Sequence, residues 1–204
     1  MARLADPGLA LRRRRQILEA ALYCFRRRGF HQATMQEICA EAGISPGALY
    51  RYFASKSDII AAIAEDEHRD GGAMLSGETR EGGFLEGLGA LAGHFFARCM
   101  EEGHASIFAD VLAEAARDPH LAARLTQIDA QRIARLSEAM RAAQARGEID
   151  PQLDARAAAQ ILMAAMAGLA TRHMLIGGDS AAATADFRTL AARFLTARAQ
   201  AAAQ

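Results

Sequence analysis

The chain has 204 residues, of which 51% are hydrophobic and 24% charged, the composition of an ordinary globular protein with enough residues for a sizeable core. No apolar run reaches the roughly 20 residues that a membrane helix needs, and the basic N-terminus lacks the long apolar core of a secretory signal. The three cysteines are far apart and form no CxxC pair, so we expect a reducing cytoplasm, with Cys24, Cys39 and Cys99 as small buried residues rather than redox sensors.

A formal net charge of zero hides an uneven distribution of charge along the chain. Residues 1–60 hold ten lysines and arginines against five acidic residues, which leaves +5 on this segment and −5 on the remainder. A basic first third indicates a polyanionic partner for that third alone. The run Arg12–Arg15, taken by itself, is equally typical of a solvated surface.

The first two predicted helices follow from periodicity and from residues that end or cap a helix. Apolar residues fall on one stripe from about Leu11 to Arg28, and Gly29 ends that helix. Thr34 then begins a short helix as its N-cap, with Glu37 three positions later completing a capping box. This helix extends from Met35 to about Ala42.

The remaining predicted elements are helices too, because alanine and leucine are abundant and alternating β-branched runs are absent. Ser45 caps a third helix that has Pro46 at its first position, and a fourth begins near Ser57 and ends near Arg69. A glycine-rich loop is expected at about 71–83. Five further helices are expected at about 84–102, 104–117, 119–146, 153–176 and 182–203.

Two short helices joined by a tight turn that contains glycine form a helix-turn-helix motif. The turn needs a positive φ, which Gly43 adopts without steric cost. Tyr50 and Tyr52 carry hydroxyls able to donate to phosphate oxygens, although either ring could simply be packed with an incidental hydroxyl. Phe53 is expected in the core. Lys56 is expected near the start of the fourth helix, where free N–H groups also favour a phosphate.

A family resemblance rests on the stretch ILEAALYCFRRRGFHQATMQEICAEAGISPGALYRYFASKSDIIAAI, residues 17–63. It resembles the N-terminal domain of TetR-type (tetracycline-repressor-like) transcriptional regulators, apart from Cys39, where alanine is usual. The resemblance implies an all-α fold. It places a three-helix DNA-binding domain at residues 1–55, with the helix-turn-helix at about 34–53. Residues 56–204 would form a larger helical domain for effector binding and dimerisation that begins with a linking helix.

The resemblance further implies a homodimeric repressor that binds a pseudo-palindromic double-stranded operator and is released by a small apolar or aromatic effector. It implies no cofactor, metal or membrane partner. By position, phosphate contacts fall to Thr34, Tyr50, Tyr52 and Lys56. Ser45, Pro46, Gly47 and Ala48 would lie at the bases. Because those four side chains are small, specificity is expected to depend partly on Gln36, Arg51 and DNA shape.

The C-terminal helices offer two sets of candidate residues. Large apolar or adaptable side chains make up the expected effector pocket, although such a stripe is also typical of a core: His94, Phe95, Phe108, Met140, Met163, Met166 and Met174. Small residues next to apolar ones allow the last two helices to pair with their copies in a four-helix bundle: Ile161, Ala165, Gly168, Leu169, Phe187, Leu190 and Phe194.

Two other classes of protein remain as alternatives: an all-helical enzyme, and an interaction module whose helix-turn-helix is only structural. GLGALAG at 87–93 has the wrong spacing for a dinucleotide loop and follows no strand. The chain contains neither GxSxG nor HExxH, and its histidines form no i, i+4 metal pair. A purely structural motif would not need the +5 charge. We therefore predict a DNA-binding regulator and no enzyme.

Overall fold

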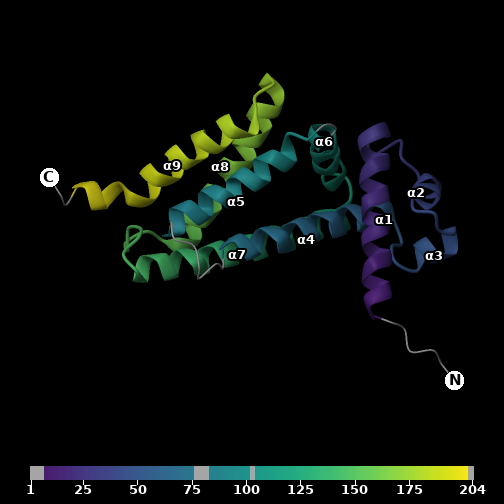
Figure 1. Cartoon of the computed structure of the whole chain (residues 1–204), viewed down its shortest axis with the longest axis horizontal. Coiled ribbons are helices and arrows are strands. Elements are labelled where there is room, and N and C mark those ends of the chain that lie inside the picture. Colours follow the sequence, from purple (N-terminus) through teal and green to yellow (C-terminus); the bar gives the residue numbers. More distant parts are fainter. Residues whose placement is uncertain (1–6, 76–82, 102–103, 202–204) are drawn as a thin grey trace. The chain divides into compact units, whose positions relative to one another are not determined.

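A computed structural model describes residues 7–75, 83–101 and 104–201 of the chain (Figure 1). Nine α-helices and no strand occur within these ranges, which confirms the all-α prediction. The helices are α1 (Pro7–Arg28), α2 (Met35–Glu41), α3 (Pro46–Tyr50), α4 (Lys56–Leu75), α5 (Gly83–Cys99), α6 (His104–Ala115), α7 (Pro119–Ala145), α8 (Ala155–Ile176) and α9 (Ser180–Ala201).

The chain divides into two compact units. The first unit comprises Met1–Asp66 and Glu102–Leu125, and the second comprises Glu67–Glu101 and Thr126–Gln204. The division falls inside α4 and inside α7, so each unit draws on separate stretches of sequence. The predicted boundary after residue 55 separates a DNA-binding domain from a domain for effector binding and dimerisation. This assignment of functions stays a prediction.

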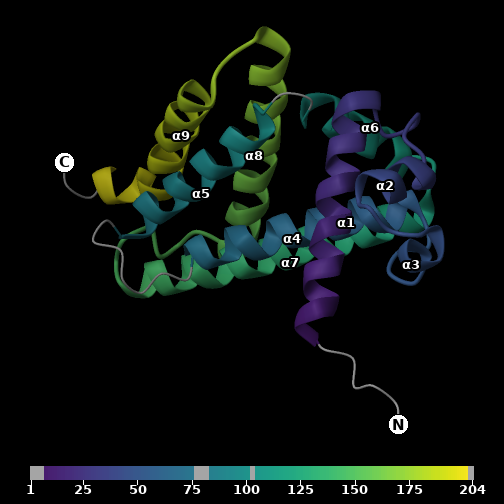
Figure 2. The same ribbon diagram turned by 45° about the vertical axis from the view of Figure 1, so that its right-hand side comes forward.

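The core of the first unit is built around the buried face of α1. Ile17, Leu18, Ala21 and Phe25 are buried there at helical spacing, as their periodicity predicted. The Phe25 ring lies 5.2 Å from that of Phe30, centroid to centroid. Helices α2 and α3 lie on one side of α1, as Figures 1 and 2 show.

Helix α6 also belongs to the first unit, where it contacts α1 and the loop that follows it. The Phe30 backbone N–H donates to the Asp110 carboxylate at 2.9 Å. Gly29 precedes it with φ of 79°, and a side chain there would also approach Asp110. The α1–α2 loop is therefore held by a helix some 80 residues later in the chain.

The second unit is a helical layer in which α9 packs against both α5 and α8. Phe96 and Phe187 meet edge to face in its core, with ring centroids 6.2 Å apart. The Glu148 carboxylate accepts hydrogen bonds from the Arg146 side chain and the Phe84 backbone N–H, at the start of α5. Those bonds, the one from Arg146 foremost, lower the pKa of Glu148.

One sequence-based expectation about the helices needs correction. The glycine-rich loop does not begin at residue 71, because α4 continues through Gly71 and Gly72 to Leu75; residues 76–82 lie outside the described residues. Helix α8 is long and apolar enough by length and composition to span a membrane, although Arg156 and Arg172 interrupt its apolar residues. Its buried side chains, Leu162 and Met166 among them, pack in the second unit's core, as expected of a core helix.

The three cysteines are free and buried, which agrees with their interpretation as small apolar residues. Cys24 and Cys39 belong to the first core and Cys99 to the second. Burial raises the pKa of the Cys24 and Cys39 thiols, so little thiolate forms near neutral pH.

Candidate nucleic-acid interface

The helix-turn-helix begins with a complete capping box at α2. The Thr34 hydroxyl accepts from the Glu37 backbone N–H at 3.2 Å, and the Glu37 carboxylate accepts from the Thr34 N–H at 2.9 Å. That second bond is the main reason why the pKa of Glu37 is lowered. Arg28 also pairs with Glu37 at 2.8 Å. The predicted start of α2 is confirmed, and Thr34 remains exposed beside it.

The turn itself depends on Gly43, whose φ is 60°. An added Cβ would meet nothing within 4 Å, so backbone conformation rather than space requires glycine here. The Ile44 N–H donates to the Cys39 carbonyl at 3.0 Å, which closes the turn over the small buried Cys39. On the other side, the Gln16 amide of α1 donates to the Ala42 carbonyl at 2.6 Å.

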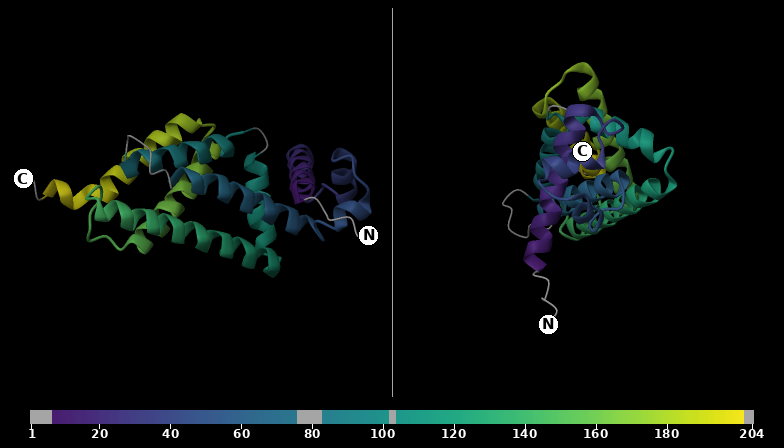
Figure 3. Two further views of the ribbon diagram at one scale, coloured as in Figure 1. Left: turned by 60° about the horizontal axis from the view of Figure 1, so that its bottom comes forward. Right: turned by 90° about the vertical axis from the view of Figure 1, so that its right-hand side faces the viewer.

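The recognition helix α3 starts as predicted. The Ser45 hydroxyl accepts from the Ala48 N–H at 3.3 Å, and Pro46 occupies the first turn. Leu49 is fully buried and anchors α3 to the core. Ser45, Pro46 and Gly47 are exposed, whereas Ala48 is half-buried. The left panel of Figure 3 shows α1 foreshortened, with α2 and α3 beside it.

Three long polar or aromatic side chains of this motif are exposed. Gln36 on α2 and Arg51 after α3 are exposed, and the Tyr50 side chain is 55% exposed, so its hydroxyl is available to a ligand. Tyr52 is half-buried against the core, and the Arg51 guanidinium lies 5.6 Å from its ring centroid. Phe53 is buried, as predicted.

Lys56, expected to contact phosphate, also makes contacts within the first unit. Its ammonium donates to the carbonyls of Phe30 at 2.6 Å and His31 at 3.0 Å, and lies 4.9 Å from the Phe30 ring centroid. Burial lowers its pKa. Two of its three N–H donors are thus engaged inside the first unit. Lys56 is therefore the first residue of α4 and also stabilises the α1–α2 loop. Sequence reasoning missed this second role.

Part of the positive charge of the first unit is compensated by acidic side chains. Arg14 donates to both carboxylate oxygens of Asp66 at 2.9 Å and lies 3.7 Å from Glu65. Glu65 also pairs with Arg124 of α7 at 2.7 Å. These partners are distant in sequence, so no local signal could have identified them. The net charge of +5 on residues 1–60 includes Arg14, although this arginine is paired with Asp66 and Glu65 of α4, which lie outside that segment.

The residues predicted for an effector pocket are distributed over both units. Met140 and Met166 are buried in the second core, where Phe95, Met163 and Met174 pack half-buried against it, and His94 is exposed. Phe108 belongs to α6 of the first unit, and its side chain lies outside the described residues. The assignment of these residues to a pocket stays a prediction.

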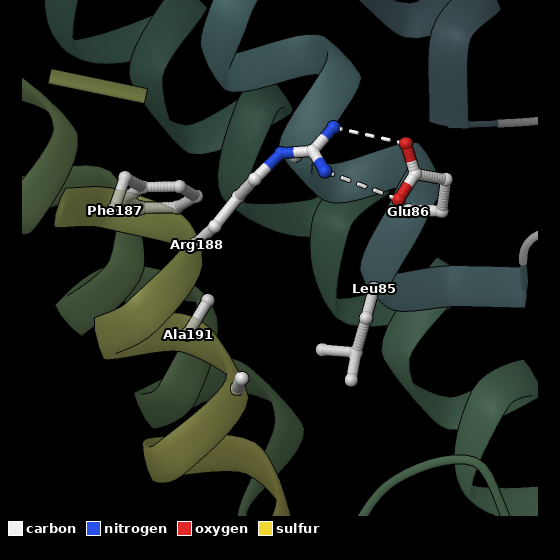
Figure 4. A pocket seen from close by; sticks show the side chains of 7 residues that line it. Leu85, Glu86, Phe187, Arg188 and Ala191 are labelled. Atoms are coloured by element: carbon white, nitrogen blue, oxygen red, sulfur yellow. Dashed lines mark hydrogen bonds and ion pairs between the residues drawn. The ribbon is translucent and has the colours of Figure 1, made fainter. Parts of the chain in front are cut away.

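A small groove lies elsewhere in the second unit, between α5 and α9 (Figure 4). It encloses about 210 Å³ between apolar side chains such as Leu85 and the Arg188–Glu86 ion pair, whose closest atoms are 2.9 Å apart. The Arg188 side chain crosses Gly89, where a Cβ would lie 2.6 Å from its Nε. None of the predicted effector residues lines this groove. Sequence reasoning missed Gly89 as the residue that admits the arginine.

The predicted dimer residues divide into an exposed set and a buried one. Ile161 is 51% and Leu190 39% exposed, Gly168 is exposed, and Ala165, Leu169 and Phe194 are half-buried. Phe187 is wrong as a surface residue, because it is fully buried in the second core. The remaining residues form an apolar stripe along α8 and α9.

Among the described residues, no group of three potential metal ligands lies together.

Known proteins that resemble this chain in sequence and fold are regulators of transcription. Residues 17–63 match the family model described as bacterial regulatory proteins, tetR family. Residues 80–194 match the model described as tetracyclin repressor-like, C-terminal domain, which spans more than half of the chain. The chain belongs to the TetR family. The sequence-based resemblance is confirmed, and the helix-turn-helix above is the DNA-binding motif of a transcriptional regulator.

Individual relatives agree with this assignment. The HTH-type transcriptional regulator UidR of Escherichia coli K12 is 32% identical over 160 residues, which cover 74% of this chain and 76% of UidR. The structure of Salmonella enterica GusR is 29% identical, covers 94% of this chain and 98% of GusR, and has a TM-score of 0.73. SmeT from Stenotrophomonas maltophilia, solved with triclosan, is 28% identical over 80% of each chain, with a TM-score of 0.64. These relatives show that the enzyme alternative is wrong for this TetR-family chain.

Proposed function

We propose that this TetR-family regulator is a ligand-responsive repressor that binds a pseudo-palindromic operator as a homodimer and is released by a small apolar effector. The observation that carries the proposal is the pre-formed helix-turn-helix, capped at Thr34 and Ser45, with Tyr50 exposed at the end of α3. Residues 1–55 supply DNA binding, and the rest of the chain supplies effector binding and dimerisation. We place the protein in the cytoplasm, with the DNA.

Within the proposed complex, α3 enters the major groove and the flanking residues hold the phosphate backbone. Tyr50 and Tyr52 donate to phosphate oxygens, and the remaining N–H of Lys56 does the same. Thr34 joins them when its hydroxyl leaves the Glu37 carboxylate, to which it donates at 3.2 Å. Ser45, Pro46, Gly47 and Ala48 face the bases. Since these four offer few hydrogen-bonding groups, the specificity depends partly on Gln36, Arg51 and the deformability of the duplex.

The DNA contact is tested best at Tyr50, because Lys56 also stabilises the fold. Tyr50→Phe removes one hydroxyl from an exposed ring and leaves the buried neighbour Leu49 in place. We expect operator binding to weaken by roughly 1–3 kcal/mol, the range of a single lost contact. Fluorescence anisotropy with a duplex selected from a random library by the wild-type protein measures the change.

The matched control for that measurement is Tyr23→Phe. Tyr23 is an exposed tyrosine on α1, with Arg27 5.6 Å from its ring centroid, and no DNA contact is assigned to it. Its hydroxyl should be dispensable for operator affinity. Full affinity in Tyr50→Phe, with the melting temperature unchanged, would refute the assignment of Tyr50.

The effector is proposed to bind in the second unit, where Phe95, Met163 and Met174 lie half-buried at the edge of the core. Methionine side chains are flexible and can adapt their conformation to an apolar ligand. The groove between α5 and α9 is smaller than the roughly 300–1,000 Å³ of typical ligand sites, so an effector bound there would have to enlarge it. The triclosan complex of SmeT supports an aromatic compound of this kind.

Effector and operator should weaken each other by the same factor. A ligand shifts the protein between two states only by binding one of them better, and this coupling is reciprocal, typically about 5- to 150-fold. We expect calorimetry with a compound found in an aromatic panel that includes triclosan to show this loss of affinity when operator is present. Equal affinity with and without operator would mean that the bound compound does not control DNA binding.

A further inference from the structure

The first turns of α1 carry a basic run that the DNA-binding motif leaves unused. Arg12–Arg15 precede residue 17, where the match to the family model begins, and no DNA contact has been assigned to them. Arg14 is directed toward α4, where it pairs with Asp66 and Glu65. Arg15 lies 3.4 Å from Glu19 of its own helix. The run is thus not a uniform solvated surface, because Arg14 and Arg15 each have acidic partners.

Arg13 is tied to the helix-turn-helix through one amide. The Arg13 Nη1 donates to Gln16 Oε1 at 2.9 Å, and the Nε2 of the same amide donates to the Ala42 carbonyl at 2.6 Å. Ala42 is the C-cap of α2, directly before Gly43 of the turn. Gln16 therefore fixes the Arg13 guanidinium beside the turn that precedes the recognition helix. Arg12, four residues before Gln16, lies on the same face of α1.

The contact leaves the charge of Arg13 in place. Gln16 is neutral, so its hydrogen bond orients the guanidinium without compensating it, unlike the carboxylates that surround Arg14. A planar guanidinium presents several N–H donors in a geometry that matches phosphate oxygens. Because the side chain is already oriented, less conformational entropy is lost when it binds an anion. The partner indicated by this arrangement is a phosphate next to DNA already bound by α3.

We propose that Arg13, oriented by Gln16 and assisted by Arg12, binds the phosphate backbone of DNA beside the half-site that α3 reads. The contact lengthens the footprint of each protomer and adds affinity that does not depend on base sequence. The inference rests on the proposed operator binding and extends it to residues outside the helix-turn-helix. Gln16 acts as a positioning residue, and Arg13 makes the contact.

The experiment measures the salt dependence of binding by the full-length chain to a duplex that the wild-type protein selects from a random library. Each phosphate contact contributes about 0.9 to the slope of log affinity against log salt concentration. With one contact per protomer, Arg13→Gln should make the slope of a dimer shallower by about 1.8 and weaken binding on the order of tenfold. Arg13→Lys should keep the slope, and Gln16→Ala should weaken binding with a smaller change in slope.

The control is Arg135→Gln, which removes the same charge from an exposed position on α7 of the second unit and should leave the slope unchanged. Hydroxyl-radical footprints should shrink at the outer edges for Arg13→Gln alone. An unchanged slope for Arg13→Gln overturns the inference while operator binding by α3 stands. A loss of affinity with an unchanged slope and footprint also overturns it, since that pattern marks a structural role. Absence of duplex binding by the wild-type protein overturns both proposals.

Discussion

An Ile161→Arg, Leu190→Arg double variant is expected to sediment as a monomer and to bind the selected operator at least about 100-fold more weakly than wild type. Two linked DNA-binding domains bind with 10²- to 10⁴-fold higher affinity than one, because the second binding event becomes intramolecular. A monomer that carries one helix-turn-helix reads only half of a pseudo-palindrome. Most of the affinity for the full site should therefore be lost.

The two positions were chosen because they are exposed in one protomer. Ile161 lies on α8 and Leu190 on α9, where both contribute to the apolar stripe that also includes Gly168 and Phe194. An added Cβ at Gly168 would meet nothing within 4 Å in the protomer, which leaves room for a partner helix to approach. Burying an unpaired arginine in a dimer interface costs far more than it does at an exposed site.

The control is a Gln127→Arg, Gln131→Arg variant, which adds the same two charges to exposed positions on α7. It corrects for the general attraction between added positive charge and DNA. Sedimentation at micromolar concentration and anisotropy with the full duplex are measured together. If the Ile161→Arg, Leu190→Arg variant remains dimeric, the interface assigned to α8 and α9 is wrong.

Phe25→Ala is the substitution expected to cost the most stability in the first unit, about 3–5 kcal/mol. Phe25 is fully buried, and its ring packs against that of Phe30 in the loop that Lys56 and Asp110 also hold. Truncation leaves a cavity at the junction of α1 with this loop. Because the chain has two compact units, the loss should appear as an earlier first transition rather than as a shift of one global melt.

Tyr23→Ala supplies the comparison for that variant. It removes an aromatic ring of similar size from the exposed side of the same helix and should change the free energy of unfolding by well under half as much. Urea titrations followed by helicity, together with operator binding at each urea concentration, measure both effects. Equal losses in the two variants would show that Phe25 is not central to the first core.

Local signals in the sequence were sufficient to predict the helix-turn-helix. The capping box involves only Thr34 and Glu37, and the left-handed conformation of the turn involves only Gly43. Both features depend on atoms within a few residues of each other, so the local sequence is enough to predict them. The buried stripe of α1 followed from its periodicity in the same way. Glycine was a weaker guide at residues 71 and 72, since a cost of about 1 kcal/mol per residue does not by itself end a helix.

Tertiary contacts account for the features that were not predicted. Lys56 bonds to carbonyls 25 and 26 residues before it, and nothing near Lys56 in the sequence indicates those partners. Phe187 was taken as an interface residue because small and apolar residues surround it, yet the packing of α9 on α5 buries it against Phe96. Periodicity shows that a helix has an apolar side. It does not distinguish a side that faces the protomer's own core from one that faces a partner.

The distribution of the cysteines gives each unit its own chemical reporter. Cys24 and Cys39 are buried in the first core and Cys99 in the second, so an alkylating reagent reaches each thiol only when the surrounding structure opens. Labelling followed by peptide mass spectrometry would thus measure the opening free energy of the two units in one native sample, without a mutation or an added dye. Operator or effector added to the same sample would reveal which unit each of them stabilises.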